Sequence, residues 1–163
     1  MDDSVARSLL KWPDVPDVYG WLSLDRRGNF LIRSTSAPPS FERIGNAALR
    51  EFICRNYQAD ARGCWYFQNG PQRVFVKLAY TPLVAHLQGE SLFDHCGREF
   101  GEPSQVLLDD EGSILLAGGT GLAVLDDRDL ERFSDRLEEG AEALPRVSRG
   151  SVPRQFGFEP DPV

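Results

Sequence analysis

The chain has 163 residues, which is enough for one domain with a substantial core or for two small halves packed together. Its composition, 41% hydrophobic and 26% charged, is that of an ordinary globular protein, and no apolar run approaches the roughly 20 residues of a membrane-spanning helix. The net charge of −7 disfavours a general nucleic-acid binder, because phosphate contacts need a basic field. The sequence therefore predicts neither a nucleic-acid partner nor a membrane partner.

The charge differs between the two halves of the chain. Residues 1–80 hold 11 Lys and Arg against 8 Asp and Glu, a net +3, whereas residues 81–163 hold 7 against 17, a net −10. Halves of opposite charge would attract each other if they packed together. The alternative interpretation is that the acidic excess only keeps the second half well solvated.

The amino-terminal residues and the cysteines predict a compartment. The opening MDDSVARSLLKWP begins acidic and contains no apolar signal region, so we expect no secretory signal. Cys54, Cys64 and Cys96 are sparse and have no Cys-x-x-Cys spacing, which favours reduced thiols in a cytoplasmic protein. Buried cysteines behave by default as small hydrophobic residues, and redox sensing is the alternative.

The first elements in chain order are a short helix and two strands. Ser4–Lys11 has apolar residues at helical spacing, and the prolines after it end the helix because they favour extended backbone. Tyr19–Leu24 and Asn29–Arg33 are predicted strands around a turn, and Ser34–Ser40 is a predicted loop. A second helix is expected over Ala47–Gln58, with Asn46 as its N-cap.

The strongest local signal is Gly63–Leu78, in which two apolar-rich runs flank Asn69-Gly70. Asn-Gly tolerates the positive φ that both central residues of a tight hairpin turn require. A two-residue loop at this point sets Tyr66 opposite Arg73. One face of the hairpin then faces the core and the other does not: the first holds Trp65, Phe67, Val74, Val76 and Leu78, and the second holds Tyr66, Arg73, Phe75 and Lys77.

The second half contains shorter elements between turn signals. Thr81-Pro82 predicts a helix start, with Leu83, Val84 and Leu87 on the buried side. A helix is also predicted from Asp126 or Asp127 to about Glu139. Strands are predicted between these helices, at Leu92-Phe93, Arg98–Phe100, Gln105–Leu108, Ser113–Ala117 and Leu122–Leu125. The tail from Pro145 has four prolines and is expected to be extended, docked through Phe156 and Phe158.

The pattern Asp-x-x-Gly recurs four times, at Asp25–Gly28, Asp60–Gly63, Asp94–Gly97 and Asp109–Gly112. We expect each Asp to accept backbone N–H groups and each Gly to adopt positive φ. The similar surroundings of the second and fourth copies predict two related β-β-α units, although such hairpin turns also recur by chance. The predicted fold is α+β, with antiparallel hairpins in curved sheets and about four packed helices. One domain would span residues 1–144, with halves at about 12–88 and 89–140, followed by a Pro-rich extended tail at 145–163.

Three stretches, Tyr19–Gly28, Arg43–Leu49 and Gly63–Val76, resemble small proteobacterial proteins of an uncharacterised domain-of-unknown-function family. The resemblance covers about Trp12–Leu137. It implies an α+β protein of repeated units and suggests a role in signal transduction. It implies no catalytic residues.

Asp94-His95-Cys96 is the one place where a carboxylate, an imidazole and a thiol are adjacent. A metal site or a Cys-His nucleophile needs such groups to converge. Adjacent side chains on a strand point to opposite faces, however, and on a tight turn they diverge. We therefore interpret the three as turn residues and keep an enzyme of unknown reaction as an alternative.

The second face of the hairpin, Tyr66, Arg73, Phe75 and Lys77, is the predicted ligand site. Two cations interleaved with two aromatic rings can hold a small anionic or planar ligand by charge-assisted hydrogen bonds and stacking. The same residues could equally form a half-exposed face covered by a helix, with the cations extending to solvent.

Other polar clusters have local explanations. The acidic stretches Asp109–Glu111 and Asp126–Asp129 fit a hairpin turn and a helix start, and Gly118–Gly121 lacks the following helix of a phosphate loop. No cofactor and no metal site are predicted.

The leading hypothesis is a non-enzymatic cytoplasmic regulatory or signal-transduction module that binds a small anionic ligand or a protein partner. The second is a structural or interaction protein that meets another chain through Trp12, Tyr19 and the Pro-rich tail. The oligomeric state stays open.

Overall fold

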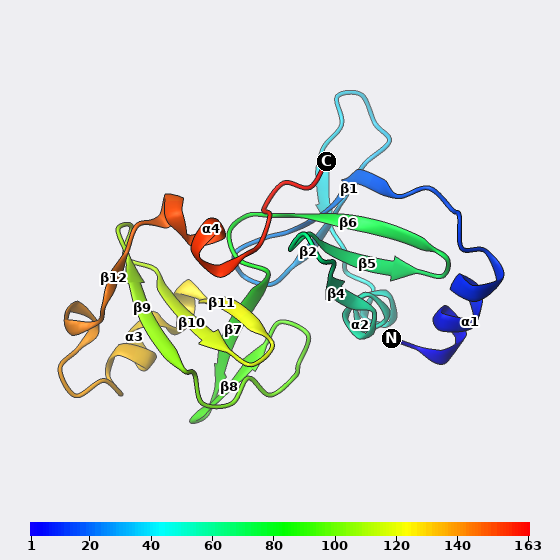
Figure 1. Ribbon diagram of the computed structural model, residues 1–163. Helices are drawn as coiled ribbons and strands as arrows, with labels where there is room; N and C mark the ends of the chain where they lie inside the picture. The colour runs from blue at the N-terminus through cyan, green and yellow to red at the C-terminus, as the bar shows by residue number, and fades with distance from the viewer. The chain divides into compact units, whose positions relative to one another are not determined.

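The computed structural model describes residues 1–163 and divides the chain into two units (Figure 1). Unit 1 comprises Met1–Asp25, Asn29–Ala79 and Phe158–Val163, and unit 2 comprises Arg26–Gly28 and Tyr80–Gly157. Each unit contains one open six-stranded sheet with short helices, which confirms the predicted α+β class. No helix combines the length and the apolarity needed to cross a membrane.

The sheet of unit 1 has the strand order β3-β2-β1-β6-β5-β4. All neighbours are antiparallel except β1 and β6, which are parallel. Helix α2 lies beside β4 and β5 (Figure 1). The elements are α1 (Asp3–Lys11), β1 (Val18–Leu24), β2 (Phe30–Arg33), β3 (Phe41–Arg43), α2 (Ala47–Arg55), β4 (Tyr57–Ala59), β5 (Trp65–Asn69) and β6 (Gln72–Leu78).

One face of this sheet forms the core of unit 1. The alternation along β1, β5 and β6 places apolar side chains on that face, because successive residues of a strand point to opposite sides. Asn46 caps α2 as predicted, and its side chain accepts a hydrogen bond from the Leu49 N–H at 2.9 Å. The buried residues include Leu22, Leu24, Phe30, Ile53, Phe67, Val76 and Leu78.

The hairpin turn lies one residue later than the Asn-Gly signal predicts. Asn69 pairs with Gln72 and Tyr66 pairs with Phe75, so the loop residues are Gly70 and Pro71. The physical reason is Pro71, which has no N–H and cannot exchange both hydrogen bonds of the pair that would close a turn at Asn69-Gly70. Gly70 has φ +57° and the proline ring imposes a negative φ next to it, which suits a type II′ turn. Each residue of β5 pairs with the β6 residue two positions after the predicted partner. Because side chains alternate with a period of two, both faces keep their predicted members.

The sheet of unit 2 has the order β12-β9-β10-β11-β7-β8. Its neighbours are antiparallel except for β11 with β7 and β12 with β9. The strands are β7 (Leu83–Gln88), β8 (Ser91–Asp94), β9 (Gln105–Asp109), β10 (Ile114–Gly118), β11 (Gly121–Leu125) and β12 (Arg146–Val147). Short helices follow β11: η1 (Asp127–Asp129), α3 (Leu130–Ser134), η2 (Ala141–Ala143), η3 (Arg149–Ser151) and α4 (Val152–Phe156).

Five predicted elements differ from the structure. The helix predicted over Ala47–Gln58 ends at Arg55 and is followed by β4, and the predicted strand Arg98–Phe100 is an isolated bridge of Glu99 with Phe93. The helix predicted after Pro82 is the strand β7, because a parallel strand buried on both faces has a continuous apolar run that resembles a short buried helix. The helix predicted to reach Glu139 ends at Ser134. The tail is not simply extended, since it contains β12 and α4, and its end pairs with unit 1 through a hydrogen bond from Leu78 N–H to Pro160 O.

The two sheets share a topology. In each, an antiparallel pair (β1–β2 or β7–β8) is followed by a three-stranded meander (β4–β5–β6 or β9–β10–β11) whose last strand runs parallel to the first strand of the pair. This arrangement is consistent with two related units. The repeating part contains more strands than the predicted β-β-α unit, and β7, predicted as the helix that ends the first copy, is instead the first strand of the second.

The four Asp-x-x-Gly turns form as predicted. Each glycine has φ between +77° and +87°. Asp60, Asp94 and Asp109 each accept backbone N–H groups from the residues two and four positions later, at 2.8–3.0 Å. Asp25 accepts the N–H of Asn29 at 2.9 Å. These carboxylates are part of the turns themselves.

Candidate functional site

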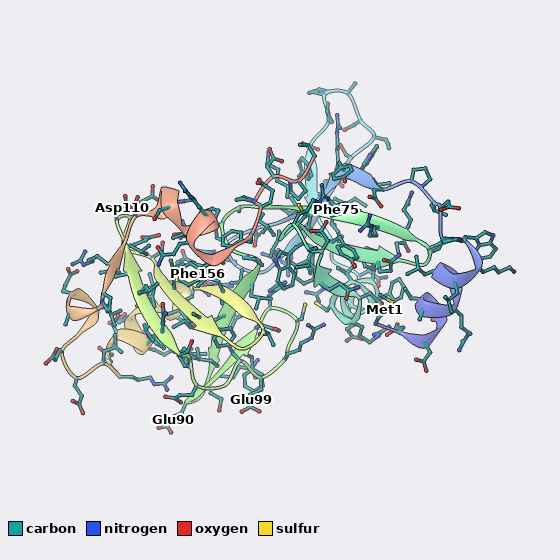
Figure 2. All side chains as sticks on the ribbon, viewed as in Figure 1. Met1, Phe75, Glu90, Glu99, Asp110 and Phe156 are labelled. Atoms are coloured by element: carbon teal, nitrogen blue, oxygen red, sulfur yellow. The ribbon has the colours of Figure 1, made fainter.

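The structure brings three of the four predicted ligand residues together. Phe75 on β6, labelled in Figure 2, is 1% exposed. Its ring lies 5.5 Å from the Tyr66 ring, centroid to centroid. The Arg73 guanidinium lies 5.6 Å from the Tyr66 ring and 5.4 Å from the Phe75 ring. Lys77 extends into solvent farther along β6, where it pairs with Ser23 of β1. Phe75 is therefore a buried support for the other two and cannot itself touch a ligand.

Tyr66 and Arg73 line a cleft of about 480 Å³ within unit 1, which we call the Tyr66–Arg73 cleft. This volume falls in the range of small-molecule sites. One wall is the segment between α1 and β1, and the other is the β5–β6 hairpin. The lining residues are Met1, Leu9, residues 13–17, Tyr66, Gln68, Pro71 and Arg73.

Two side-chain contacts hold the residue 13–17 segment against β6. Arg73 forms a bidentate ion pair with Asp17, with both N···O distances 2.9 Å. Gln72 Nε2 donates to the carbonyl oxygen of Pro16 at 3.1 Å. Residues 13 and 14 form a turn and residues 15–17 have no regular secondary structure, so these two side-chain contacts position the segment.

The ionisable groups of the cleft are of mixed sign. The hydrogen bonds that Arg73 donates to Asp17 raise the pKa of Arg73 above its usual value, and burial raises the pKa of Tyr66. Asp14 and Asp17 both line the cleft, so an anion can enter only where it takes the place of Asp17 on the guanidinium. The cleft can thus offer one planar cation, one phenol ring and an apolar proline wall.

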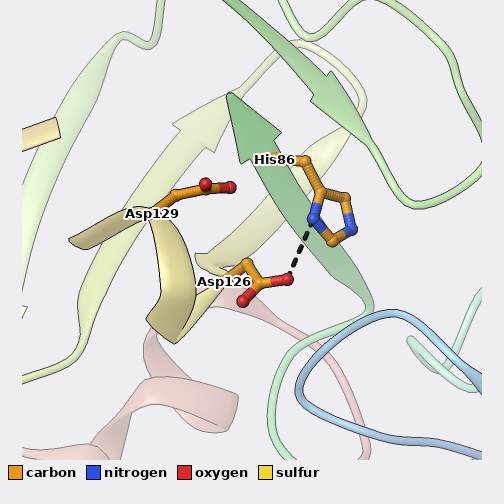
Figure 3. Close-up of side chains that lie close together, drawn as sticks. All are labelled: His86, Asp126 and Asp129. Carbon is orange, nitrogen blue, oxygen red and sulfur yellow. Dashed lines mark ion pairs between the residues drawn. The ribbon is translucent and has the colours of Figure 1, made fainter. Parts of the chain in front are cut away.

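A second cluster, in unit 2, consists of His86, Asp126 and Asp129, whose ligand atoms all lie within 4.8 Å of one another (Figure 3). His86 Nδ1 lies 3.1 Å from Asp126 Oδ2. A histidine nitrogen and carboxylate oxygens are ligands that zinc and other transition metals accept. These three residues are therefore the ones that could hold a metal ion.

The carboxylates of this cluster are already occupied by protein donors. Asp126, 1% exposed, accepts hydrogen bonds from the backbone N–H of Arg128 and from its guanidinium. Asp129 accepts the Leu87 N–H at 3.0 Å and the Arg132 guanidinium at 2.8 Å. A cation would have to displace both arginines, so the present arrangement acts as an ion-pair network.

Sequence reasoning missed this cluster because it placed His86 on a helix. The signal that could have found it is the parallel pairing of β7 with β11, in which Ala85 pairs with Leu125. The residues that follow a parallel pair emerge at the same edge of the sheet. His86 and Asp126 are those next residues.

The adjacent Asp94, His95 and Cys96 have structural partners. Asp94 accepts the N–H groups of Cys96 and Arg98, and the Val84 N–H donates to His95 Nδ1 at 3.2 Å. The three side chains do not form the convergent set that nucleophilic chemistry needs.

The expectation of three reduced thiols is wrong for two of the cysteines. Cys54 and Cys96 are disulfide-bonded. Cys64 is free and buried, and burial raises the pKa of its thiol, so it stays protonated and unreactive.

The fold is that of a class of uncharacterised α+β proteins. A DUF1285 family protein from Silicibacter pomeroyi DSS-3, solved at 2.50 Å resolution, aligns with a TM-score of 0.55 and 14% identity over 83% of this chain and 78% of that chain. A DUF1285 family protein from Shewanella baltica OS155, solved at 1.40 Å, aligns with a TM-score of 0.50 and 13% identity over 72% of this chain and 93% of that chain. At these identities the likeness shows the fold alone.

The family model DUF2944, described as "Protein of unknown function (DUF2946)", matches residues 1–163, and the chain belongs to this family. No curated protein matches this chain. The predicted resemblance to an uncharacterised family is confirmed, and the sources of the two solved structures are consistent with its proteobacterial origin.

Proposed function

We propose that this protein is a non-enzymatic regulatory or signal-transduction module of the cytoplasm, and that it binds a small anionic ligand with a planar part in the Tyr66–Arg73 cleft. The observation that carries the proposal is the setting of Arg73. Its guanidinium contacts two aromatic rings and makes one bidentate ion pair, while 39% of its side chain stays exposed.

A ligand anion that replaces Asp17 would keep both hydrogen bonds of the guanidinium fork. Carboxylate and phosphate groups match that fork in the same bidentate geometry. The Tyr66 ring beside it offers a stacking surface for a planar group. The proposed ligand class is therefore an aromatic or heterocyclic carboxylate or phosphate.

The exchange also provides a route from binding to regulation. Asp17 anchors the residue 13–17 segment to β6, and after displacement only the Gln72–Pro16 hydrogen bond would hold it. A ligand that favours the released segment shifts the population toward that state, which a partner could recognise.

The test is calorimetric titration with phenyl phosphate, inorganic phosphate and phenol as probes. We expect phenyl phosphate to bind most tightly, because it satisfies both the fork and the ring. Arg73→Ala should weaken its binding about tenfold or more, and Asp17→Asn should tighten it, because the competing carboxylate is gone.

The matched control is Arg62→Ala, since Arg62 also lies over Phe75, at 5.6 Å, but does not line the cleft. Circular dichroism would verify that each variant is folded. The proposal is refuted if folded Arg73→Ala binds phenyl phosphate as the natural protein does.

A cytoplasmic location belongs to the same proposal and needs its own test, because disulfide bonds are rare in reducing compartments. If the protein is cytoplasmic, an alkylating reagent present when the cells are lysed should modify Cys54 and Cys96. Protection of both would contradict it.

The second hypothesis, docking through Trp12, Tyr19 and the Pro-rich tail, stays a proposal, and part of the tail packs into the fold. Glu159 N–H donates to Gly63 O at 2.9 Å, and Val152 and Phe158 are buried. Removing residues 145–163 would therefore cut into both units, so loss of binding by that deletion could not identify the tail as a docking arm.

A further inference from the structure

The outer face of strands β3, β2, β1 and β6 carries aromatic and cationic side chains in two rows. In one row Arg33 pairs with Phe41 on β3 and lies over the Trp21 ring of β1, at 5.6 Å. In the other row Arg43 pairs with Leu31, Leu31 with Ser23, and Ser23 with Lys77. We call Trp21, Leu31, Arg33, Phe41, Arg43 and Lys77 the aromatic–cationic face.

This face is opposite to the core. Leu22 and Leu24, which alternate with Trp21 and Ser23 along β1, are buried on the inner side. On the outer side Trp21 is 41% exposed and Phe41 is 46% exposed. Exposure of large aromatic side chains to water is unfavourable. A cluster of exposed aromatic side chains is therefore typical of an interaction surface.

The cations of the aromatic–cationic face are Arg33, Arg43 and Lys77, and Asp25, just after β1, lines the groove beside them. Arg33 and Arg43 form no ion pair, and Lys77 reaches Asp161 only at 4.0 Å, with both side chains largely exposed. Glu42, between Phe41 and Arg43 on β3, pairs with Ile32 on the other side of the sheet. Asp25 accepts hydrogen bonds from the backbone N–H and the side chain of Asn29 in its own turn, so Arg33 and Arg43 are left for a partner's carboxylates.

A groove of about 300 Å³ accompanies these residues. Leu31, Phe41 and Lys77 line it together with Ser23 of the same face. The strand β3 is the edge of the sheet, and an edge strand presents unpaired backbone groups to which a further strand can add. Apolar anchors, unpaired cations and a sheet edge thus occur in one place.

From these observations we infer that the aromatic–cationic face binds an acidic segment of a partner protein, in which carboxylate and large apolar side chains alternate at every second position. The alternation follows from the rows, because a strand added beside β3 places every second side chain over this face. Acidic groups would meet Arg33 and Arg43, and apolar groups would meet Phe41 and Trp21. Aromatic residues and Arg are the residue types that carry most binding energy at interfaces.

The charge distribution favours a protein segment over nucleic acid. Unit 1 as a whole holds 9 Lys and Arg against 10 Asp and Glu, a net −1. The positive charge is therefore local to one face, whereas nucleic-acid binding depends on an extended basic field. This surface is separate from the Tyr66–Arg73 cleft, and the inference does not rest on the function proposed for that cleft.

The test uses fluorescence anisotropy with four labelled probes. Three are synthetic ten-residue peptides: one in which Glu and Leu or Phe alternate at every second position with Ser between them, the same peptide with Lys for Glu, and the same peptide with Ser for Leu and Phe. The fourth is a single-stranded oligo(dT). We expect the Glu-apolar peptide to bind at least about tenfold more tightly than each of the others.

Two variants locate the binding. Phe41→Ser should weaken the Glu-apolar peptide about tenfold, whereas Leu49→Ser, an equally exposed apolar residue on α2, should not change it. The double variant Arg33→Glu and Arg43→Glu should reverse the preference toward the Lys-apolar peptide. Its control is Arg7→Glu with Arg154→Glu, which changes the net charge equally at exposed positions outside the face.

Thermal denaturation would confirm that each variant is folded. The inference is overturned if no peptide binds, if the charge-reversed face keeps its preference for the acidic peptide, or if both double variants behave alike. It is also overturned if oligo(dT) binds more tightly than the Glu-apolar peptide, which would identify a nucleic-acid surface. Because Arg73 is intact in every variant, failure here leaves the phenyl phosphate titration unaffected.

Discussion

Unit 1 and unit 2 each contain a carboxylate–arginine pair with hydrogen bonds of ideal length, but the two pairs differ in burial and in the number of donors. Asp17 is partly exposed and bonds to one side chain, Arg73. Asp126 is buried, accepts from the side chain and the backbone of Arg128, and lies 3.1 Å from His86 Nδ1. A buried carboxylate with several donors cannot exchange partners cheaply, whereas a partly exposed one can. The Arg73–Asp17 pair is therefore suited to exchange with a ligand, whereas Asp126 stabilises the fold.

The largest effect is expected from Phe75→Ala. Phe75 is fully buried beneath Arg73, and its ring stacks on Tyr19 with centroids 4.7 Å apart. Truncating a buried phenylalanine should lower the free energy of unfolding by about 3–5 kcal/mol. Urea denaturation would measure this change. A loss below about 1 kcal/mol would mean that the aromatic support of the cleft is not packed as described.

Asp126→Asn should cost about 3 kcal/mol in the free energy of unfolding. The substitution removes the charge that His86 and Arg128 bond to, and it leaves their donors without a strong buried acceptor. The control is Asp127→Asn in the next position, where the ion pair with Arg27 is exposed and worth little. Equal losses in the two variants would contradict the structural role given to Asp126.

Arg73→Ala should lower the free energy of unfolding by no more than about 1 kcal/mol, because its ion pair is partly exposed. Its effect should appear instead in phenyl phosphate binding. A large loss of stability would mean that Arg73, like Asp126, is a structural residue. The proposed difference between the two carboxylate–arginine pairs would then be wrong.

The smallest expected effect concerns pH. Hydrogen bonds from Arg27 lower the pKa of Asp127 from 3.8 to about 2. Because the folded-state pKa is lower than the unfolded one, the pair contributes stability above about pH 4, and this contribution is lost as the pH falls through about 2. The difference in melting temperature between the natural protein and Asp127→Asn should narrow from pH 5 to pH 2.5. It should also narrow in 1 M NaCl, because both groups are exposed to solvent. A difference that stays constant would show that the pair is not responsible.

The candidate site was only partly predictable from the sequence. The hairpin pattern placed Tyr66, Arg73 and Phe75 on one face, since period-two alternation survives a shift of the pairing by two residues. It could not show that Phe75 is buried or that Asp17, 56 positions earlier, pairs with Arg73. It also missed the cluster around His86, because the apolar run of β7 fits a helix and a buried strand equally well.

The sequence by itself determined the features whose partners lie within a few residues. The four Asp-x-x-Gly turns and the Asn46 cap form as predicted, because each side chain bonds a backbone N–H only two to four positions away. Only the tertiary structure decided that residues 83–88 form a strand, and that Asp17 meets Arg73 and His86 meets Asp126. Those outcomes depend on which segments pack together, and burial between distant strands then outweighs local preference.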